Sequence, residues 1–583
     1  LPLHGRGRKR RGTETGVMGN GEERIALLQG EVKEEEVSGT GLVRRSWIES
    51  RKLWRIVGPA IFGRVVIYSL NVITQAFAGH LGDLELASIS IANTVVVGFS
   101  FGLMLGMASA LETLCGQAFG AKKYHMLGVY LQRSCIVLFL CAVLLLPIYF
   151  FATPILMLIG QPPELAVQAG QVSMWFIPLH FSFVFLFPLQ RFLQCQLKNS
   201  IIVIVSAVCL VVHLLVTWLF VSKLQFSLIG TVFTLNFSWW VGIFCLFGYI
   251  ACGSCPDTWT GFSMEAFGGL WEFIKLSAAS GVMLCLENWY YRVLILMTGY
   301  LKNAEIAVDA ISICMSLNGW ELMIPLAFFA GTGVRVANEL GAGNGKAARF
   351  ATIVSVATSA VIGLFFCLLV LVLHDKFALI YSSSSVVVEA VDELSLLLAL
   401  TVLLNSVQPV LSGVAVGSGW QALVAYVNIG TYYLVGIPAG ILMGWVFKLG
   451  VLGIWAGMIG GTAVQTLILA IMTIRCDWDE EVRLRRQFFV LIVFPNSRSV
   501  VDSKCTGCLI CRPKTPAHAW RNWLLPVNHE AMTIAGTWKQ ILPWINIRTM
   551  LVLAFIKLRI EFPDGDVERY YNDGCDPCNI YLL

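Results

Sequence analysis

Twelve long apolar stretches between residues 54 and 474 constrain the fold of this chain more than any other feature. The second six repeat the first six at an offset of about 220 residues, so that Gly79-His80-Leu81 returns as Gly299-Tyr300-Leu301. Segment 117–122 returns in the same way as 338–343, with a slip of one residue. Many secondary transporters are duplicated membrane bundles with a solute site between the halves. The repeat therefore predicts two related bundles.

Composition places these stretches in a bilayer. The chain is 57% apolar and only 13% charged, with a mean hydropathy of +0.74, which is more apolar surface than a soluble protein can bury. A helix needs about 20 apolar residues to cross the membrane, and segments 86–111, 351–373 and 450–474 supply them without one charged residue. We expect an all-α integral membrane protein with twelve transmembrane helices in two six-helix lobes related by a pseudo-two-fold axis. The predicted spans are 54–80, 86–111, 134–159, 172–195, 201–222, 228–251, 270–299, 306–332, 350–373, 394–417, 422–446 and 451–474.

Five regions follow from these spans. They are a mostly disordered N-terminal segment (1–53), a first lobe (54–251), an inter-lobe loop (252–269), a second lobe (270–474) and a tail (475–583). The chain begins without a methionine, and the first candidate start is Met18, so we expect residues 1–17 to be untranslated. Beyond about residue 486 the apolar periodicity ends, and we interpret the rest of the tail as the product of a mispredicted exon.

Basic residues gather in alternate loops and predict the orientation. The loops we place in the cytosol contain Arg44, Arg45, Arg51, Lys52, Lys122, Lys123, Arg133, Arg191, Lys198, Arg335, Lys346 and Arg349. The opposite loops hold Lys223, Lys302, Lys376 and Lys448 beside several acidic residues. By the positive-inside rule both termini are cytosolic, and the even number of spans agrees. The net charge of +5 reflects this bias, so we expect no nucleic-acid partner.

Two terminal motifs have a functional and a bland interpretation. Glu23, Leu27 and Leu28 fit an acidic dileucine signal that adaptor complexes bind, but a solvated tail matches so loose a pattern by chance. In the tail, the triplet at 505, 508 and 511 and the pair Cys575 and Cys578 have metal-ligand spacing. More than 60 residues separate the two groups and no histidine adjoins either, so we expect no metal site.

Glu287, well inside the seventh span, is the candidate for proton coupling. An ionisable group at mid-membrane costs about 2.5–3.5 kcal/mol and needs a partner or a water-filled cavity. A carboxyl in that position can hold or release a proton as the cavity opens. The alternative is a static ion pair with Arg292, which lies five residues away and about 140° round the helix, a poor geometry for pairing. We favour the functional interpretation.

Other ionisable residues in the spans have weaker claims. Glu112 ends the second span, where it can pair with Arg335 at the matching position of the other half, and we interpret both as a structural or gating pair. Arg64 and Glu321 are also deep enough to contact a cavity. For His180 and His213, hydrogen bonding within the bundle is a more common role than titration.

The tenth span contains a polar cluster around Pro409. Because proline removes a backbone donor, the helix should loosen where Asn405 and Gln408 share one face. Such amides hold solutes in discontinuous transporter helices. Hydrogen bonding that holds the bundle together is an equally good interpretation.

Several segments resemble the plant branch of the multidrug and toxic compound extrusion (MATE) family. They are 112–118 (ETLCGQA), 285–287 (CLE), 325–327 (PLA), 335–343 (RVANELGAG), 408–415 (QPVLSGVA) and 419–421 (GWQ), within a match that covers about residues 45–483. The resemblance implies two six-helix lobes that rock between inward-open and outward-open states. It also implies export driven by proton or sodium entry, with no enzymatic activity and no cofactor besides the ion gradient.

The resemblance assigns roles to two residues. Glu287 matches the acid that the family uses for proton coupling in the second lobe. Asn405 stands where plant relatives often have aspartate, and an amide cannot take up a proton. Asparagine there is similar to the flavonoid-transporting branch, which leaves the coupling ion open.

Our first hypothesis is a monomeric proton-coupled antiporter that exports flavonoid glycosides or xenobiotics across the vacuolar or plasma membrane. Aromatic residues that can stack on such a solute are Trp289, Tyr290, Tyr291, Trp320, Tyr432 and Tyr433, although aromatics near helix ends are also interfacial anchors. The second hypothesis is a passive anion (chloride or organic acid) conduit of the vacuolar membrane, because the cavity that has Asn405 keeps Arg292. A lipid-linked-sugar flippase would need a more basic central cavity.

Overall fold

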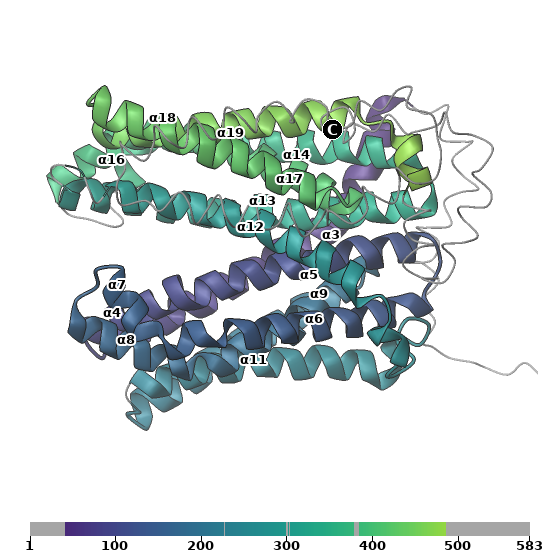
Figure 1. Cartoon of the computed structure of the whole chain (residues 1–583), viewed down its shortest axis with the longest axis horizontal. Helices are drawn as coiled ribbons and strands as arrows, with labels where there is room; N and C mark the ends of the chain where they lie inside the picture. The colour runs from purple at the N-terminus through teal and green to yellow at the C-terminus, as the bar shows by residue number, and fades with distance from the viewer. Residues whose placement is uncertain (1–40, 227, 299–300, 302–303, 378–383, 485–583) are drawn as a thin grey trace, which may run out of the picture.

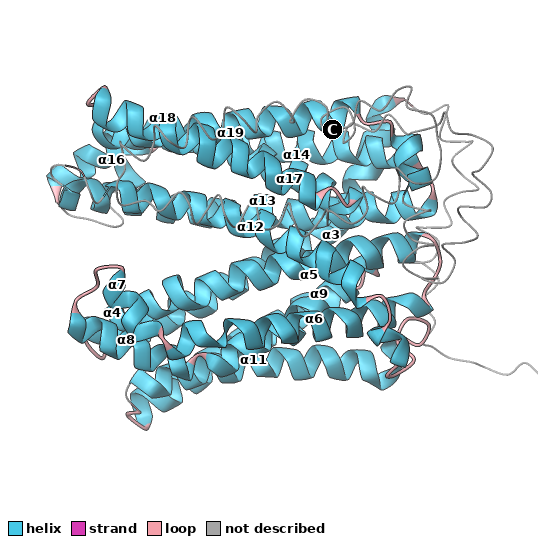
Figure 2. Cartoon of the chain, in the orientation of Figure 1, coloured by secondary structure: helices cyan, strands magenta, loops and turns pink. Residues whose placement is uncertain are grey.

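Within the residues that the computed structural model describes, which are 41–226, 228–298, 301, 304–377 and 384–484, every regular element is a helix (Figure 2). The helices form two bundles, which we call the N lobe and the C lobe (Figure 1). The N lobe consists of α3 (Leu42–Gly79), α4 (Asp83–Ile91), η2 (Ala92–Val97), α5 (Gly98–Gly120), α6 (His125–Phe150), α7 (Ala152–Leu158), α8 (Pro163–Trp175), α9 (Ile177–Cys195), α10 (Asn199–Thr217), η3 (Trp218–Lys223), α11 (Leu228–Tyr249) and η4 (Ile250–Ser254). A connection with the short helix η5 (Met264–Phe267) leads to the C lobe.

The C lobe repeats the same plan. It consists of α12 (Leu270–Thr298), α13 (Ala304–Ala342), α14 (Gly345–Val372), α15 (His374–Phe377), α16 (Ser385–Ser418), α17 (Gln421–Asn428), η7 (Ile429–Gly436), α18 (Ile437–Ile441), η8 (Leu442–Val446) and α19 (Gly450–Arg475). Helices in direct succession, such as α4–η2–α5 and α17–η7–α18–η8, each form one span that contains π-helical turns.

The described helices confirm the predicted membrane bundle. Nine of them are long and apolar enough to cross a bilayer, and the pair α8 and α9, taken as one bent span, makes ten. Helices α12 and α16, with 29 and 34 residues, have the required length but carry acidic residues, and they complete the twelve. The fourth span begins earlier than predicted, at Pro163, and bends by 45° between α8 and α9. Pro178, at the start of α9, explains the break because it cannot donate to the preceding turn.

The lobes meet at one end of the molecule, where α3 begins and α19 ends, and diverge toward the other end (Figure 1). Helix α5 packs on α12 and α13, and α3 packs on α13. We call the closest part of this contact the glycine seam. It consists of Gly106, Gly116, Gly120, Gly281 and Gly341.

Backbones touch directly across the glycine seam. A Cβ atom on Gly120 would overlap the carbonyl of Asn338, and one on Gly341 would overlap the backbone of Gln117. Hydrogen bonds reinforce the contact, since Thr113 Oγ1 donates to the Val416 carbonyl at 2.6 Å and Gln117 Nε2 to the Gly417 carbonyl at 3.2 Å. The lobes are therefore in direct backbone contact at this end of the described chain.

Candidate functional site

The Glu287 carboxyl, partly buried on α12, is the centre of a polar network in the C lobe. Its Oε1 accepts hydrogen bonds from Gln408 Nε2 at 3.1 Å, Ser412 Oγ at 3.3 Å and Asn428 Nδ2 at 3.2 Å. Among the described residues, no cation forms an ion pair with it, and Arg292 does not approach it. Neutral donors stabilise a carboxylate without the fixed partner that would prevent protonation. This geometry suits a group that gains and loses a proton.

The network continues from Asn428 into the core of the lobe. Asn428 Nδ2 also donates to the Met283 carbonyl at 3.2 Å, and its Oδ1 accepts from Gln465 Nε2 at 2.8 Å. Tyr432 donates in turn to Gln465 Oε1 at 2.8 Å. Asn428 and Gln465 were not among the residues predicted from the sequence. The available signal was that each is a polar residue within an apolar span, the eleventh and the twelfth.

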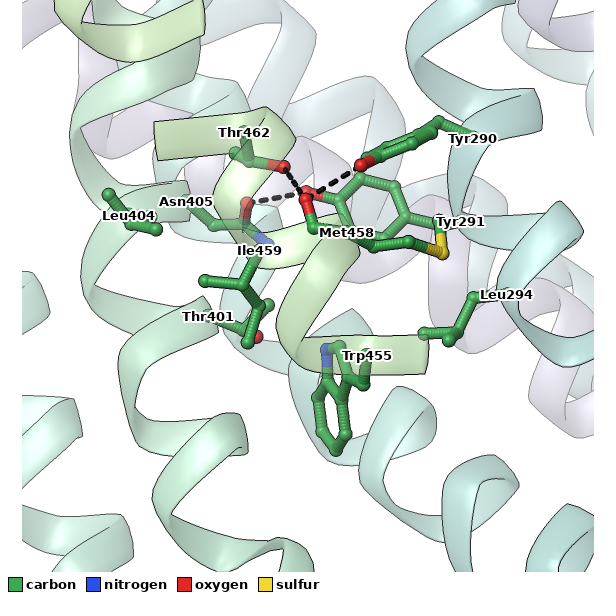
Figure 3. Close-up of a pocket in the computed structure, with 10 residues that line it drawn as sticks. All are labelled: Tyr290, Tyr291, Leu294, Thr401, Leu404, Asn405, Trp455, Met458, Ile459 and Thr462. Atoms are coloured by element: carbon green, nitrogen blue, oxygen red, sulfur yellow. Dashed lines mark hydrogen bonds between the residues drawn. The ribbon is translucent and has the colours of Figure 1, made fainter. Parts of the chain in front are cut away.

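Asn405 belongs to a second, neighbouring set of hydrogen bonds (Figure 3). Its Oδ1 accepts from the Tyr291 hydroxyl at 2.7 Å, and its Nδ2 donates to Asn318 Oδ1 at 3.1 Å. The pocket beside it, between α12, α16 and α19, has a volume of about 10 Å³, close to what one water molecule needs. Asn405 is 1% exposed, and its hydrogen bonds join α16 to α12 and α13 in this conformation.

Gln408 and Asn405 therefore have different surroundings despite their shared helix. Gln408, 5% exposed, donates to Glu287 and to Ser412 Oγ at 3.0 Å. The structure thus brings Gln408 to the predicted proton site and gives Asn405 other partners. Helix α16 continues through Pro409, which leaves the Asn405 carbonyl without its helical donor.

Two of the predicted cavity residues on α12, Trp289 and Arg292, face the N lobe. Trp289 is 43% exposed and its ring meets Phe99 edge to face at 5.8 Å, and the exposed Arg292 packs against Gly98. Tyr290 points into the C lobe instead, where it lines the pocket beside Asn405. Its buried ring stacks on Tyr432 at 4.2 Å, and its hydroxyl donates to the Met458 carbonyl at 2.6 Å (Figure 3).

The predicted pairing of Glu112 with Arg335 is also corrected. Glu112 is fully buried and lies 2.8 Å from Arg191 of its own lobe. Arg335 instead makes a bidentate contact with Glu49 of α3, at 2.7 and 3.2 Å, and an ion pair with Glu339. Arg335 still joins the two lobes, but through the first helix of the N lobe, because α13 packs on α3 at the closed end.

The remaining ionisable candidates have structural partners. His213 lies between Thr74 Oγ1 at 3.1 Å and Ser238 Oγ at 3.0 Å, and His180 contacts the Ala142 carbonyl at 3.0 Å. The charge of Arg64 acts on Arg191 and Glu112.

Metal and sorting motifs find no place in the described part of the chain. Among those residues, no group of three or more His, Cys, Asp or Glu side chains is arranged to hold a metal ion. The tail cysteines 505, 508, 511, 575 and 578 and the motif with Glu23, Leu27 and Leu28 lie outside the described residues.

Comparison with known proteins identifies this arrangement of helices. The MatE family model matches residues 59–219 and 279–442, which is more than half of the chain. The chain belongs to the MATE family. MATE proteins are transporters and not enzymes, so the chain is an integral membrane efflux transporter of small organic solutes.

The MATE relatives are close in sequence and in structure. The chain is 68% identical to Protein DETOXIFICATION 27 of Arabidopsis thaliana, over 80% of this chain and 96% of that protein. It is 65% identical to Protein DETOXIFICATION 26 of the same plant, over 78% and 93%. The crystal structure of the eukaryotic MATE transporter AtDTX14 superposes with a TM-score of 0.73 at 36% identity, over 76% of this chain and 99% of that chain. These matches confirm the resemblance to plant MATE transporters.

Proposed function

We propose that this MATE transporter exports planar organic metabolites, such as flavonoid glycosides or xenobiotics, in exchange for protons that Glu287 carries. The observation that supports this is the Glu287 carboxyl, held by three neutral donors and by no cation among the described residues. A carboxyl in such a setting has hydrogen-bond partners in both protonation states.

Protonation of Glu287 can affect the contact between the lobes through α12. Protonation removes the negative charge to which Gln408, Ser412 and Asn428 donate hydrogen bonds. Gln408 and Ser412 lie on α16, and Asn428 lies on α17. Helix α12 packs on α17 and, on its other side, on α5 of the N lobe. Rearrangement of the network therefore changes the surface on which the lobes close.

Aromatic side chains on the faces between the lobes suit a planar solute. Trp289 meets Phe99 from the opposite lobe, and Trp320 of α13 meets Tyr68 of α3 at 4.5 Å. Both tryptophans are partly exposed, at 43% and 42%. Aromatic rings prefer offset-stacked or edge-to-face contacts, and the rings of a planar ligand can form the same contacts. The exposed guanidinium of Arg292 adds a donor for hydroxyl or acidic groups.

The loop charges support a proposal for the orientation in the membrane. Basic residues gather at the closed end of the molecule, so we propose that this end faces the cytosol, in the vacuolar or plasma membrane. We propose a monomer, with adaptor binding at Glu23, Leu27 and Leu28 as a route for sorting.

Transport into vesicles tests the proton coupling. With the parent protein, an acid interior should drive uptake of flavonoid glycosides, and Glu287→Gln should reduce uptake to that of empty vesicles. The matched control is Glu272→Gln, an exposed carboxyl on the same helix that pairs with Lys275, and it should transport like the parent. Equal uptake by Glu287→Gln and the parent would contradict the proposal. A sodium gradient at constant pH forms a separate arm, because a parent driven by sodium alone would also contradict it.

One feature favours the alternative of a passive anion conduit. Position 405 has a neutral amide, and Arg292 is exposed with no ion-pair partner among the described residues. An anion current that follows voltage and is unchanged in Glu287→Gln would support the conduit.

A further inference from the structure

A second carboxyl, Glu321 of α13, lies buried at the contact between α13 and α16. It is 7% exposed. Its Oε1 accepts a hydrogen bond from Ser406 Oγ at 3.3 Å, whereas its Oε2 is buried and has no hydrogen-bond partner in the part of the chain that the structure describes. Most buried polar atoms have a partner, so this oxygen requires an explanation.

Among the described residues, the helices packed on α13 bring no compensating positive charge to Glu321. Helix α3 contributes Arg64, whose charge acts instead on Arg191 of α9 and Glu112 of α5. Helix α12 contributes Tyr291, a neutral side chain that interacts electrostatically with Glu321. At this level the polar side chains of α16 and α14 are neutral, among them Asn405, Ser406 and Ser359, because the charged residues of both helices lie near their first turns.

An ionised carboxylate in this setting would be desolvated with a single neutral donor, which is strongly unfavourable. A protonated carboxyl requires much less, and its proton gives the side chain a donor of its own. This geometry favours the protonated form of Glu321 in the conformation described. For transport to use that proton, Glu321 must become accessible to water in another conformation.

Two prolines let both helices move at this level. Pro325 lies four residues after Glu321, and Pro409 lies four residues after Asn405, so neither carbonyl has its helical donor. Helices bend at such positions. Trp320, next to Glu321 in the chain, contacts Tyr68 of the N lobe, so separation of the lobes acts directly on this part of α13.

We propose that Glu321 is a second proton-binding site of the transport cycle. This inference rests on the proposed proton coupling through Glu287. Glu321 binds its proton while the lobes are shut at the glycine seam and releases it when movement of α13 against α16 admits water. Two carboxyls then move two protons for each cycle.

The stoichiometry of transport tests the second site. Proton and flavonoid glycoside fluxes are measured together in vesicles for the parent, Glu321→Gln, Glu287→Gln and the control Asp309→Asn, an exposed carboxyl on the same helix. We expect the parent and the control to move two protons per solute and Glu321→Gln to move one. An unchanged stoichiometry in Glu321→Gln would overturn the inference.

A rescue variant separates proton binding from a purely structural role. Asn405 donates to Asn318, one helical turn from Glu321, so an acid at position 405 would lie beside the vacated site. In the double variant Glu321→Gln with Asn405→Asp we expect the second proton to return. Failure of this rescue, with the protein folded, would count against a proton site at this level.

Infrared spectroscopy provides a measurement that does not require transport. At neutral pH the purified parent should show the carbonyl band of a buried protonated carboxyl that shifts in D₂O. The band should disappear in Glu321→Gln and move in frequency in Glu321→Asp, which keeps the acid if the glutamine variant does not fold. A parent without such a band would overturn the inference.

The outcomes for the two carboxyls are distinguishable. If Glu287→Gln abolishes proton-driven uptake and Glu321→Gln leaves both flux and stoichiometry unchanged, only the second site is excluded. If the parent shows no proton-driven uptake, both proposals fail. Sodium-driven transport that is lost in Glu321→Gln would show that the site binds sodium and not a proton.

Discussion

Amide side chains orient the Glu287 carboxyl, and each amide is itself oriented by a neighbour. Asn428 must turn its Nδ2 toward Glu287 because its Oδ1 accepts from Gln465. Gln465 has the matching orientation because its Oε1 accepts from Tyr432. The order of donors therefore runs from a core tyrosine to the proton site, so a change at Tyr432 reaches a carboxyl that it does not contact.

Tyr432→Phe should show what this chain of donors contributes to stability. The variant keeps the ring stacked on Tyr290 but leaves Gln465 Oε1 buried without its donor. An unsatisfied buried acceptor costs about 1–3 kcal/mol, so thermal unfolding in detergent should occur at a lower temperature. An unchanged melting temperature would show that Gln465 finds another donor.

Single residues show what the sequence could and could not predict. Glu287 was recognisable because a carboxyl inside an apolar span is costly and therefore noticeable. Its partners Ser412 and Asn428 were not, because pairing depends on how α12, α16 and α17 are rotated against one another. The repeat suggested that Glu112 pairs with Arg335, but internal symmetry does not determine which cation lies nearest to Glu112. In the structure that cation is Arg191.

At the scale of elements, the glycine seam explains how α5 closes on α12 and α13. A side chain added at Gly116 or Gly120 would occupy space that Ala337 and Asn338 fill. Because the helices approach to backbone contact, the seam has almost no tolerance for added volume.

Gly120→Ala should therefore bias the protein toward the conformation that is open at this end. Its methyl group would overlap the Asn338 carbonyl, and backbone atoms cannot rotate away. Cys195, buried beside this contact, is a natural reporter, since Asn338 Nδ2 donates to its carbonyl at 3.4 Å. With Cys195 as the only cysteine, labelling by a small thiol reagent should be faster in Gly120→Ala than in the parent.

A matched control for this variant is Gly58→Ala on α3, where an added Cβ meets nothing within 4 Å. The same labelling rate in Gly120→Ala, Gly58→Ala and the parent would contradict a role for the seam in closure.

Elements were more predictable than their irregularities. Hydrophobic length located all twelve spans, because a bilayer imposes the same requirement on each helix. The 45° bend between α8 and α9 depends on Pro178 and on packing around it, and the π-helical turns in the second and eleventh spans leave no trace in hydropathy. The prediction for span four consequently began nine residues too late, at 172 instead of Pro163.

The whole molecule is two lobes joined at one end, and Arg335 is the charged part of that joint. It is 6% exposed and contacts Glu49 of the N lobe and Glu339 of its own helix. A buried pair of this kind contributes little compared with apolar packing, but removing one partner leaves an uncompensated buried charge.

Arg335→Met should be destabilising by about 3–5 kcal/mol, because Glu339 loses its cation and Glu49 keeps only the more exposed Lys52, 3.5 Å away. The double variant Arg335→Met with Glu49→Gln should recover part of this loss, which thermal unfolding of the purified proteins will show. Both variants should also label faster at Cys195, because the joint between α3 and α13 is weakened. If the double variant is no more stable than Arg335→Met alone, the contact with Glu49 is not what holds the lobes together.

Surfaces that shut backbone against backbone make the transporter vulnerable to very small wedges. A compound that enters while the halves are apart needs only the thickness of a methyl group between Gly120 and Asn338 to stop the next closure. Such an inhibitor would act at a distance from the aromatic faces where solutes are expected to bind. It would therefore block every cargo equally, and added cargo would not displace it.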